Sequence, residues 1–290
     1  MRVVVFGATG IVGSALLPVL AAGHEVVAVS RKPRPAEKDV SWAVGDTTDA
    51  TSVREVLAGA EVAYYFVHSL GSRDFEELDL AAAKTMAREA EAAGLRQLIY
   101  LGGLGEDGDE LSPHLRSRLE TGRALASGAV PLTTLRAAVV VGRGSAAFET
   151  VVALVDRLPA MIAPRWVSTP TQPIALADTV RYLAGVAGRD EAFGETYDVG
   201  GPEVMTYREM IERIARLRGK RRLIVEVPVL TPFLSSLWLH LVTPVGASVA
   251  RPLVEGLRNP TVARDERIRE LVPIRLTPFD EAARDALREQ

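Results

Sequence analysis

A glycine-rich turn at residues 7–13 constrains the fold of this chain more than any other feature. Gly7, Gly10 and Gly13 are spaced three apart, follow the β-branched run 3–6 and precede an apolar helical pattern. Gly7 permits a tight turn, Gly10 lets the backbone approach a pyrophosphate, and Gly13 lets the helix pack close to the strand. The N-terminus of that helix supplies free N–H groups and partial positive charge for phosphates. The cofactor-binding residues predicted here are Gly7, Thr9, Gly10, Ile11, Val12 and Gly13; the alternative is a tight turn without a ligand.

The residues after the second expected strand indicate which dinucleotide binds. NAD-selective sites place an acidic residue there for the ribose 2′-hydroxyl, whereas this chain has Ser30, Arg31 and Lys32. Two cations and a hydroxyl suit a 2′-phosphate, so NADP(H) is predicted over NAD(H), unless both cations only solvate a loop. Asp46 and Thr47 follow the third expected strand, where an acid can accept from the adenine amino group or cap the next turn.

The first two thirds of the chain alternate short β-branched runs with helical patterns. This rhythm predicts βαβ units and a mainly parallel sheet. Six strands and five connections favour an α/β fold, a Rossmann-type doubly wound parallel sheet. The strands are expected at 3–6, 25–30, 40–44, 61–67, 97–101 and 132–137. Helices are expected at 11–22, 52–58, 75–93 and 114–126, with C-terminal glycines at Gly23, Gly59 and Gly94.

The pattern loosens after Gly142, which predicts a second part of the chain. Residues 148–157 and 178–186 have helical patterns, 158–171 is expected to be a proline-rich loop, and Thr206 and Glu209 form a capping box. We expect a dinucleotide-binding domain at 1–145, to which 172–200 returns. A smaller, mostly helical lobe for substrate or partner is expected at 146–290.

Composition excludes several kinds of site. The chain has no cysteine, which removes disulfides, thiolate metal sites and cysteine nucleophiles. Its formal net charge of −3 gives no attraction to nucleic acid, and the basic run 218–222 is interpreted as a solvated turn. The four histidines lack metal-ligand spacing, so no metal is predicted. The apolar run 3–6 before the turn is too short to be the core of a signal peptide, so a cytoplasmic location is expected.

Two apolar stretches, 230–245 and 247–257, need to be buried. They are interrupted by Pro232 and Pro244 and are too short to span a bilayer. They either roof the core of the second lobe or, together with Trp166 and Met161, line a pocket for a small apolar substrate that is lipid- or quinone-like. An exposed patch for a partner subunit or a peripheral membrane contact is a further interpretation. Serine hydrolysis is disfavoured because no Gly-x-Ser-x-Gly occurs, and Ser145 is predicted to cap a helix.

Three segments together resemble the extended and atypical branch of the short-chain dehydrogenase/reductases: 7–13, 45–49 and 197–202. Within that superfamily the chain is most similar to the NmrA-like, NAD(P)H-binding group, which includes relatives of the accessory NADPH-binding subunit of respiratory complex I. Segments 101–105, 114–118 and 235–238 look like bacterial members. The resemblance covers nearly the whole chain and implies a Rossmann fold that binds NAD(P)H.

The expected active site departs from that superfamily's pattern. A Ser or Thr after the fifth strand and a Tyr-x-x-x-Lys pair on the next helix are usual; here Gly102 and Gly103 follow the strand, and His114 and Arg118 take the pair's place. Arg118 could hold the nicotinamide ribose but, being always charged, could not relay a proton. His114 is a candidate general acid. The alternative is that His114 opens the helix and Arg118 pairs with Glu120.

His68 is the second candidate for proton transfer. It follows Val67 at the end of the fourth expected strand, near the carboxyl edge where doubly wound folds bind ligands. Tyr64 and Tyr65 precede it and are predicted to pack in the core. The sequence therefore favours an NADP(H)-dependent oxidoreductase that acts on an apolar carbonyl or conjugated substrate. A non-catalytic NADP(H)-binding sensor or assembly protein is the alternative.

Overall fold

A seven-stranded parallel sheet forms the larger part of the computed structural model, which describes residues 1–35, 37, 39–69, 72, 74–105, 111–227 and 257–288. The strand order is β11-β6-β5-β4-β1-β2-β3. This order reverses between β1 and β4 and confirms the Rossmann-type doubly wound sheet. The strands are β1 (Arg2–Phe6), β2 (Glu25–Ser30), β3 (Val40–Val44), β4 (Val62–Tyr65), β5 (Gln97–Gly103), β6 (Leu132–Ala137) and β11 (Thr196–Val199).

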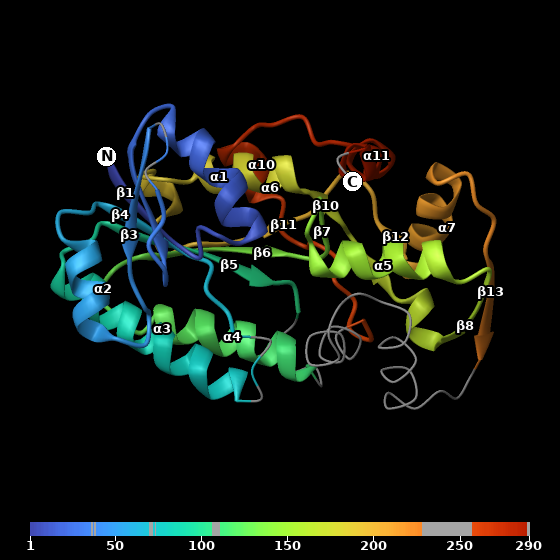
Figure 1. Cartoon of the computed structure of the whole chain (residues 1–290), viewed down its shortest axis with the longest axis horizontal. Helices are drawn as coiled ribbons and strands as arrows, with labels where there is room; N and C mark the ends of the chain where they lie inside the picture. The colour runs from blue at the N-terminus through green and yellow to red at the C-terminus, as the bar shows by residue number, and fades with distance from the viewer. Residues whose placement is uncertain are drawn as a thin grey trace.

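Helices cover both faces of this sheet (Figure 1). α1 (Ile11–Ala21), α6 (Leu176–Gly185) and α10 (Arg267–Leu271) lie on one face, and α2 (Ala50–Leu57), α3 (Phe75–Ala92) and α4 (Pro113–Leu125) on the other. Because both faces are covered, β1 is apolar along its length: Val3 and Val5 belong to one core and Val4 and Phe6 to the other.

A second core lies beyond the carboxyl ends of the strands (Figure 1). Its helices are α5 (Ala146–Arg157), α7 (Tyr207–Leu217) and α11 (Phe279–Arg288), with short pairs β7 (Val140–Val141) with β10 (Ile174–Ala175) and β9 (Pro170–Thr171) with β12 (Met205–Thr206). The loop predicted at 158–171 is partly wrong. It contains β8 (Ala160–Pro164), which pairs in parallel with β13 (Leu223–Val227), and the 3₁₀ helix η1 (Arg165–Ser168). The pairing partner is distant in sequence, so the proline-rich local pattern hides the strand.

Two of the three predicted C-terminal glycines adopt the left-handed conformation. Gly59 has φ of 73° and Gly94 has φ of 69°, where a side chain is disfavoured. Gly23 differs, because α1 ends through Ala22 in the right-handed region and Gly23 donates to the Leu20 carbonyl at 3.1 Å. The capping box at Thr206 is confirmed.

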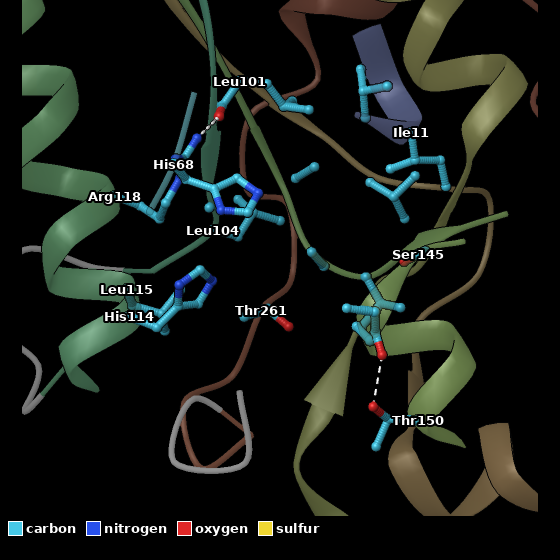
Figure 2. Close-up of a pocket in the computed structure, with 18 of the residues that line it drawn as sticks. Ile11, His68, Leu101, Leu104, His114, Leu115, Arg118, Ser145, Thr150 and Thr261 are labelled. Atoms are coloured by element: carbon cyan, nitrogen blue, oxygen red, sulfur yellow. Dashed lines mark hydrogen bonds between the residues drawn. The ribbon is translucent and has the colours of Figure 1, made fainter. Parts of the chain in front are cut away.

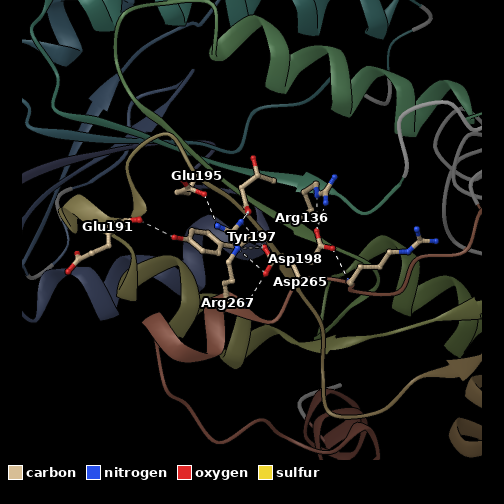
Figure 3. A network of polar contacts seen from close by, with 9 residues as sticks. Arg136, Glu191, Glu195, Tyr197, Asp198, Asp265 and Arg267 are labelled. Atoms are coloured by element: carbon tan, nitrogen blue, oxygen red, sulfur yellow. Dashed lines mark hydrogen bonds and ion pairs between the residues drawn. The ribbon is translucent and has the colours of Figure 1, made fainter.

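Residues 257–277 return along the edge of the sheet and are held there by polar contacts (Figure 3). Buried Asp198 on β11 accepts from Arg136 Nε at 2.8 Å and from the Arg264 N–H at 3.0 Å. Arg267 pairs with Asp265 at 2.9 Å and stands 5.2 Å from the ring of Tyr197. These contacts fix the segment to the last strand of the sheet.

The apolar stretches 230–245 and 247–256 lie outside the described residues. Among the helices that the structure does describe, none is long and apolar enough to cross a membrane.

Candidate functional site

One cavity of about 360 Å³ joins the glycine turn to the second core. It opens at the carboxyl edge of the sheet, where the strand order reverses. Its wall includes several predicted cofactor residues: Gly7, Gly10, Ile11, Val12, Gly13, His68, Gly102, Gly103 and Arg118. Two other predicted cofactor residues lie outside this wall: Val67 packs against the core on the α3 face, and exposed Thr9 lines a separate groove beside α1.

The glycine turn has no room for side chains. Gly7 has φ of 81°, and a Cβ there would lie 2.8 Å from the Phe66 carbonyl carbon. At Gly13 a Cβ would lie 2.4 Å from the Gly7 oxygen, which explains how closely α1 approaches β1. Helix α1 begins after Gly10 with no side-chain cap and no acidic residue in its first turn. Its positive end is thus left uncompensated, which fits the phosphates of a dinucleotide.

The residues after β2 and β3 lie at the same edge. Arg31 and Lys32 are exposed, and the Lys32 N–H donates to the Ser30 hydroxyl at 3.3 Å. Asp46 accepts from the Thr48 N–H at 2.9 Å and from the Thr48 hydroxyl at 2.7 Å, and these bonds, with Arg31 nearby, lower the pKa of Asp46. Asp46 therefore caps its own turn, as in the predicted alternative. Thr47 beside it is buried.

His68, His114 and Arg118 face the cavity from one side (Figure 2). An Arg118 Nη donates to the Leu101 carbonyl at the end of β5, and the guanidinium stands 4.8 Å from the ring of Tyr100. These contacts replace the Glu120 pairing considered from the sequence. The second terminal nitrogen of Arg118 is buried without a partner among the described residues. Such a donor fits a cofactor ribose or carboxamide.

The protonation of both histidines is shifted in the same direction. Burial, the charge of Arg118 and the proximity of His68 lower the pKa of His114 to about 4. Burial and Arg118 also lower the pKa of His68, although Asp79 opposes this. The exposed surface of His68 faces the cavity. Both shifts favour the neutral imidazole at pH 7, and proton donation by His114 stays a prediction.

Helix α4 does not begin at His114, which was the alternative considered from the sequence. The Ser112 hydroxyl accepts from the Leu115 N–H at 3.3 Å, and Pro113 takes the first helical position. His114 is thus free to turn its ring toward the cavity. Gly103 at the end of β5 faces the same helix, and a Cβ there would lie 3.1 Å from the Leu115 side chain. The helix packs where the superfamily usually has a Ser or Thr.

Sequence reasoning missed Asp79, which fixes the loop that carries His68. Asp79 is 3% exposed on α3, and its carboxylate accepts from the Ser69 N–H at 2.7 Å and from the Ser117 hydroxyl at 3.5 Å. In sequence it is one acid within an ordinary amphipathic helix, so no local signal marks it. Tyr64 lies in the core as predicted, donating to the Leu183 carbonyl at 2.9 Å.

The far half of the cavity is apolar. Trp166 lines it and meets the ring of Tyr207 edge-on at 6.2 Å between centroids. Met161, predicted to join this wall, is instead buried in the second core. The remaining apolar side chains of this half come from separated elements: Val139, Val140, Val151, Leu154, Ile211 and Leu257.

Ser145 stands at the N-terminus of α5, but it does not form the predicted cap. It occupies the N-cap position with no side-chain capping bond, and it lines the cavity (Figure 2). Its location was predicted correctly and its contact was not.

Known proteins resemble this chain in sequence and in fold. Residues 7–130 match a family model described as NAD(P)H-binding. This match agrees with the resemblance to the atypical short-chain dehydrogenase/reductases. An Arabidopsis thaliana protein named NADH dehydrogenase [ubiquinone] 1 alpha subcomplex subunit 9, mitochondrial, is 25% identical over 223 residues, which cover 72% of this chain and 56% of that protein.

Solved structures share the fold over nearly the whole chain. The Citrobacter sp. triphenylmethane reductase complexed with NADP(H) has a TM-score of 0.78 at 19% identity and covers 99% of this chain and 100% of its own. The Escherichia coli NADPH-dependent quinone oxidoreductase complexed with NADPH has a TM-score of 0.78 at 18% identity and covers 100% of this chain and 99% of its own. At these identities the likeness is one of fold.

Proposed function

We propose that the protein is an NADP(H)-dependent oxidoreductase that reduces an apolar carbonyl or conjugated acceptor. The observation that carries the proposal is the single cavity: the glycine turn, the three polar side chains His68, His114 and Arg118, and the apolar wall all border it. A cofactor held at the turn and an acceptor against the apolar wall would therefore meet. In this proposal 1–145 with 172–200 form the cofactor domain, and 146–290 contribute the substrate lobe.

The chain's own residues would hold the cofactor along the carboxyl edge. The N–H groups at the start of α1 would bind the pyrophosphate, and Arg31 and Lys32 the 2′-phosphate. The unpartnered nitrogen of Arg118 would bind the nicotinamide ribose or carboxamide. The cofactors in the Citrobacter and E. coli structures, NADP(H) and NADPH, agree with this preference.

The chemistry needs little from a protein acid. NADPH, when bound, would supply a hydride to the acceptor and would leave as NADP⁺. With the pKa of His114 near 4, water delivers the balancing proton, and the two neutral imidazoles orient water or acceptor by hydrogen bonds. Conjugated acceptors suit such a site, because delocalisation stabilises the negative charge before the proton arrives.

A second candidate is a non-catalytic NADP(H)-binding sensor or assembly protein. The absence of the Tyr-x-x-x-Lys pair from α4 favours it, since Gly102, Gly103, His114 and Arg118 stand at those places. The similarity to a protein named as a subunit of NADH dehydrogenase agrees with a role inside an assembly.

Fluorescence titration with NADPH, followed by a panel of ketones, enones and quinones, separates the two candidates. We expect tight NADPH binding and oxidation of NADPH by at least one conjugated acceptor. Tight binding with no turnover across the panel would reject the catalytic proposal and leave the sensor.

A further inference from the structure

We propose that Ser145 and the first turn of α5 form a subsite that binds the carbonyl oxygen of the acceptor. The proposal rests on the function proposed above and names the part of the chain that selects the substrate. It assigns to the second lobe the polar contact that the missing tyrosine makes elsewhere in the superfamily.

The side chain of Ser145 makes no hydrogen bond among the described residues. It is 7% exposed, makes no capping bond, and faces the cavity (Figure 2). At three other helices the N-cap side chain does accept a backbone N–H: Asp49, Ser112 and Thr206. A largely buried hydroxyl that is left free at the wall of a cavity can bond a ligand there, so this geometry points to a ligand that completes it.

The backbone around Ser145 adds further donors. Helix α5 has 12 residues, and Ala146 and Ala147 in its first turn line the same cavity. Within the described part of the chain, their N–H groups have no acceptor. The Glu149 carboxylate accepts the Gly144 N–H at 3.0 Å close to this turn. The Ser145 hydroxyl and these backbone donors fit the oxygen of an uncharged carbonyl, which becomes negative only as it is reduced.

Two other hydroxyls of the wall, those of Thr150 and Thr261, are already engaged. Thr150 donates to the Ala146 carbonyl at 2.7 Å, and the hydroxyls of Thr261 and Thr171 lie 2.8 Å apart. Around them the wall is apolar. Of these wall hydroxyls, Ser145 is therefore the one with a hydrogen free for a ligand.

This placement defines a class of substrate. Ser145 lies across the cavity from His68 and His114 (Figure 2), so an acceptor bound to α5 is held between the two polar ends. The site thus selects ketones, enones or quinones with an apolar body. A hydrocarbon of the same shape would leave the Ser145 hydroxyl without a hydrogen bond.

A pair of probes that differ in one carbonyl tests the subsite. With NADP⁺ saturating, dissociation constants of 2-acetylnaphthalene and 2-ethylnaphthalene are measured by tryptophan fluorescence for wild type, Ser145→Ala, Ser145→Thr and the control Ser127→Ala. Ser127 donates to the Ala124 carbonyl at the end of α4 and does not line the cavity. We expect a preference of about tenfold for the ketone in wild type, Ser145→Thr and Ser127→Ala, as one hydrogen bond allows. Ser145→Ala should lose it at unchanged Tm.

Three results would overturn the subsite. The first is the same ketone preference in Ser145→Ala as in wild type, and the second is an unchanged preference with a lower Tm, which indicates that Ser145 caps the helix. The third is a change in NADP⁺ affinity alone, which places Ser145 at the cofactor. The binding readout is independent of turnover. If the protein prefers the ketone but does not oxidise NADPH, the proposed function is rejected and the subsite is kept. If it oxidises NADPH but the ketone preference does not depend on Ser145, the subsite is rejected and the proposed function is kept.

Discussion

The two halves of the cavity differ in what forms their surface. The cofactor half is formed by backbone atoms: Gly7 and Gly13 leave no space for a Cβ, and the N–H groups at the start of α1, which have no capping side chain, lie beside these glycines. The substrate half is a side-chain surface that α5, η1, α7 and residues 257–261 assemble around Trp166. Backbone geometry tolerates almost no change, whereas an apolar wall tolerates swaps of similar volume. The contrast teaches that such a fold can keep one cofactor while its acceptor varies.

The strictness of the cofactor half is tested at Gly13. In Gly13→Ala the new Cβ would meet the Gly7 oxygen at 2.4 Å and the Ala8 Cα at 2.8 Å. We expect about 3 kcal/mol of lost stability and an NADPH affinity about 100-fold weaker, because α1 must move from the phosphates. Urea unfolding and NADPH titration measure both. Gly23→Ala is the control: nothing lies within 4 Å of its Cβ. Equal behaviour of the two variants would contradict the contrast.

The attachment of residues 257–277 to the sheet is tested at Asp198. Asp198→Ala leaves Arg136 without its carboxylate and frees the Arg264 N–H. We expect about 2–3 kcal/mol of destabilisation, less than for a fully buried pair because Arg136 is 35% exposed. Asp265→Ala, in the partly exposed pair with Arg267, should cost at most about 1 kcal/mol. Urea unfolding compares the two variants. A smaller loss of stability in Asp198→Ala than in Asp265→Ala would contradict the role of Asp198 in holding residues 257–277.

Cofactor choice sharpens the contrast without disturbing the fold. The double variant with Arg31→Ala and Lys32→Ala should weaken NADPH binding about 30-fold, or about 2 kcal/mol, since charge-assisted contacts to the 2′-phosphate are lost. NADH affinity is the internal control and should stay the same. If both affinities fall together, these side chains support the loop and do not select the phosphate.

The histidines in the middle of the cavity make stability depend on pH. The pKa of His114 falls from 6.5 to about 4 in the folded protein. Between these two pH values His114 is protonated in the unfolded chain but not in the folded protein. Stability is therefore complete above pH 6.5 and decreases toward pH 4. His114→Asn should reduce this pH-dependent loss by between about 1 and 2 kcal/mol. Urea unfolding at pH 7 and pH 4.5 measures it, and parallel losses in the two proteins would show that His114 titrates normally.

The tolerance of the substrate half is tested at Trp166. Trp166→Leu removes the edge-on contact with Tyr207 but keeps the wall apolar. We expect KM for an apolar acceptor to rise several-fold, about 1 kcal/mol, at unchanged NADPH affinity. Steady-state kinetics and NADPH titration measure the two. A loss of NADPH affinity would mean that the halves are not separable.

The same contrast explains what the sequence could and could not predict. The turn at Gly7, the strands and the helices are written in local patterns of glycine, β-branched and apolar residues, and the structure has them close to the expected bounds. Asp79 and the β8–β13 pair depend on partners outside their own segments, and the free hydroxyl of Ser145 is recognised only from the cavity that it lines. The shift in the pKa of His114 likewise arises from burial and from the neighbouring Arg118, and not from its own segment.

The return of residues 257–277 to the sheet sets an order for assembly during synthesis. Thr261 and Leu257 border the cavity, and the segment is fastened by the Thr277 N–H to Asp178 at 2.7 Å and by the Ala263 N–H to Gln172 at 3.0 Å. A ribosome releases these residues long after the glycine turn. A nascent chain that has reached residue 227 therefore has the glycine turn but not yet the part of the cavity wall that Leu257 and Thr261 provide.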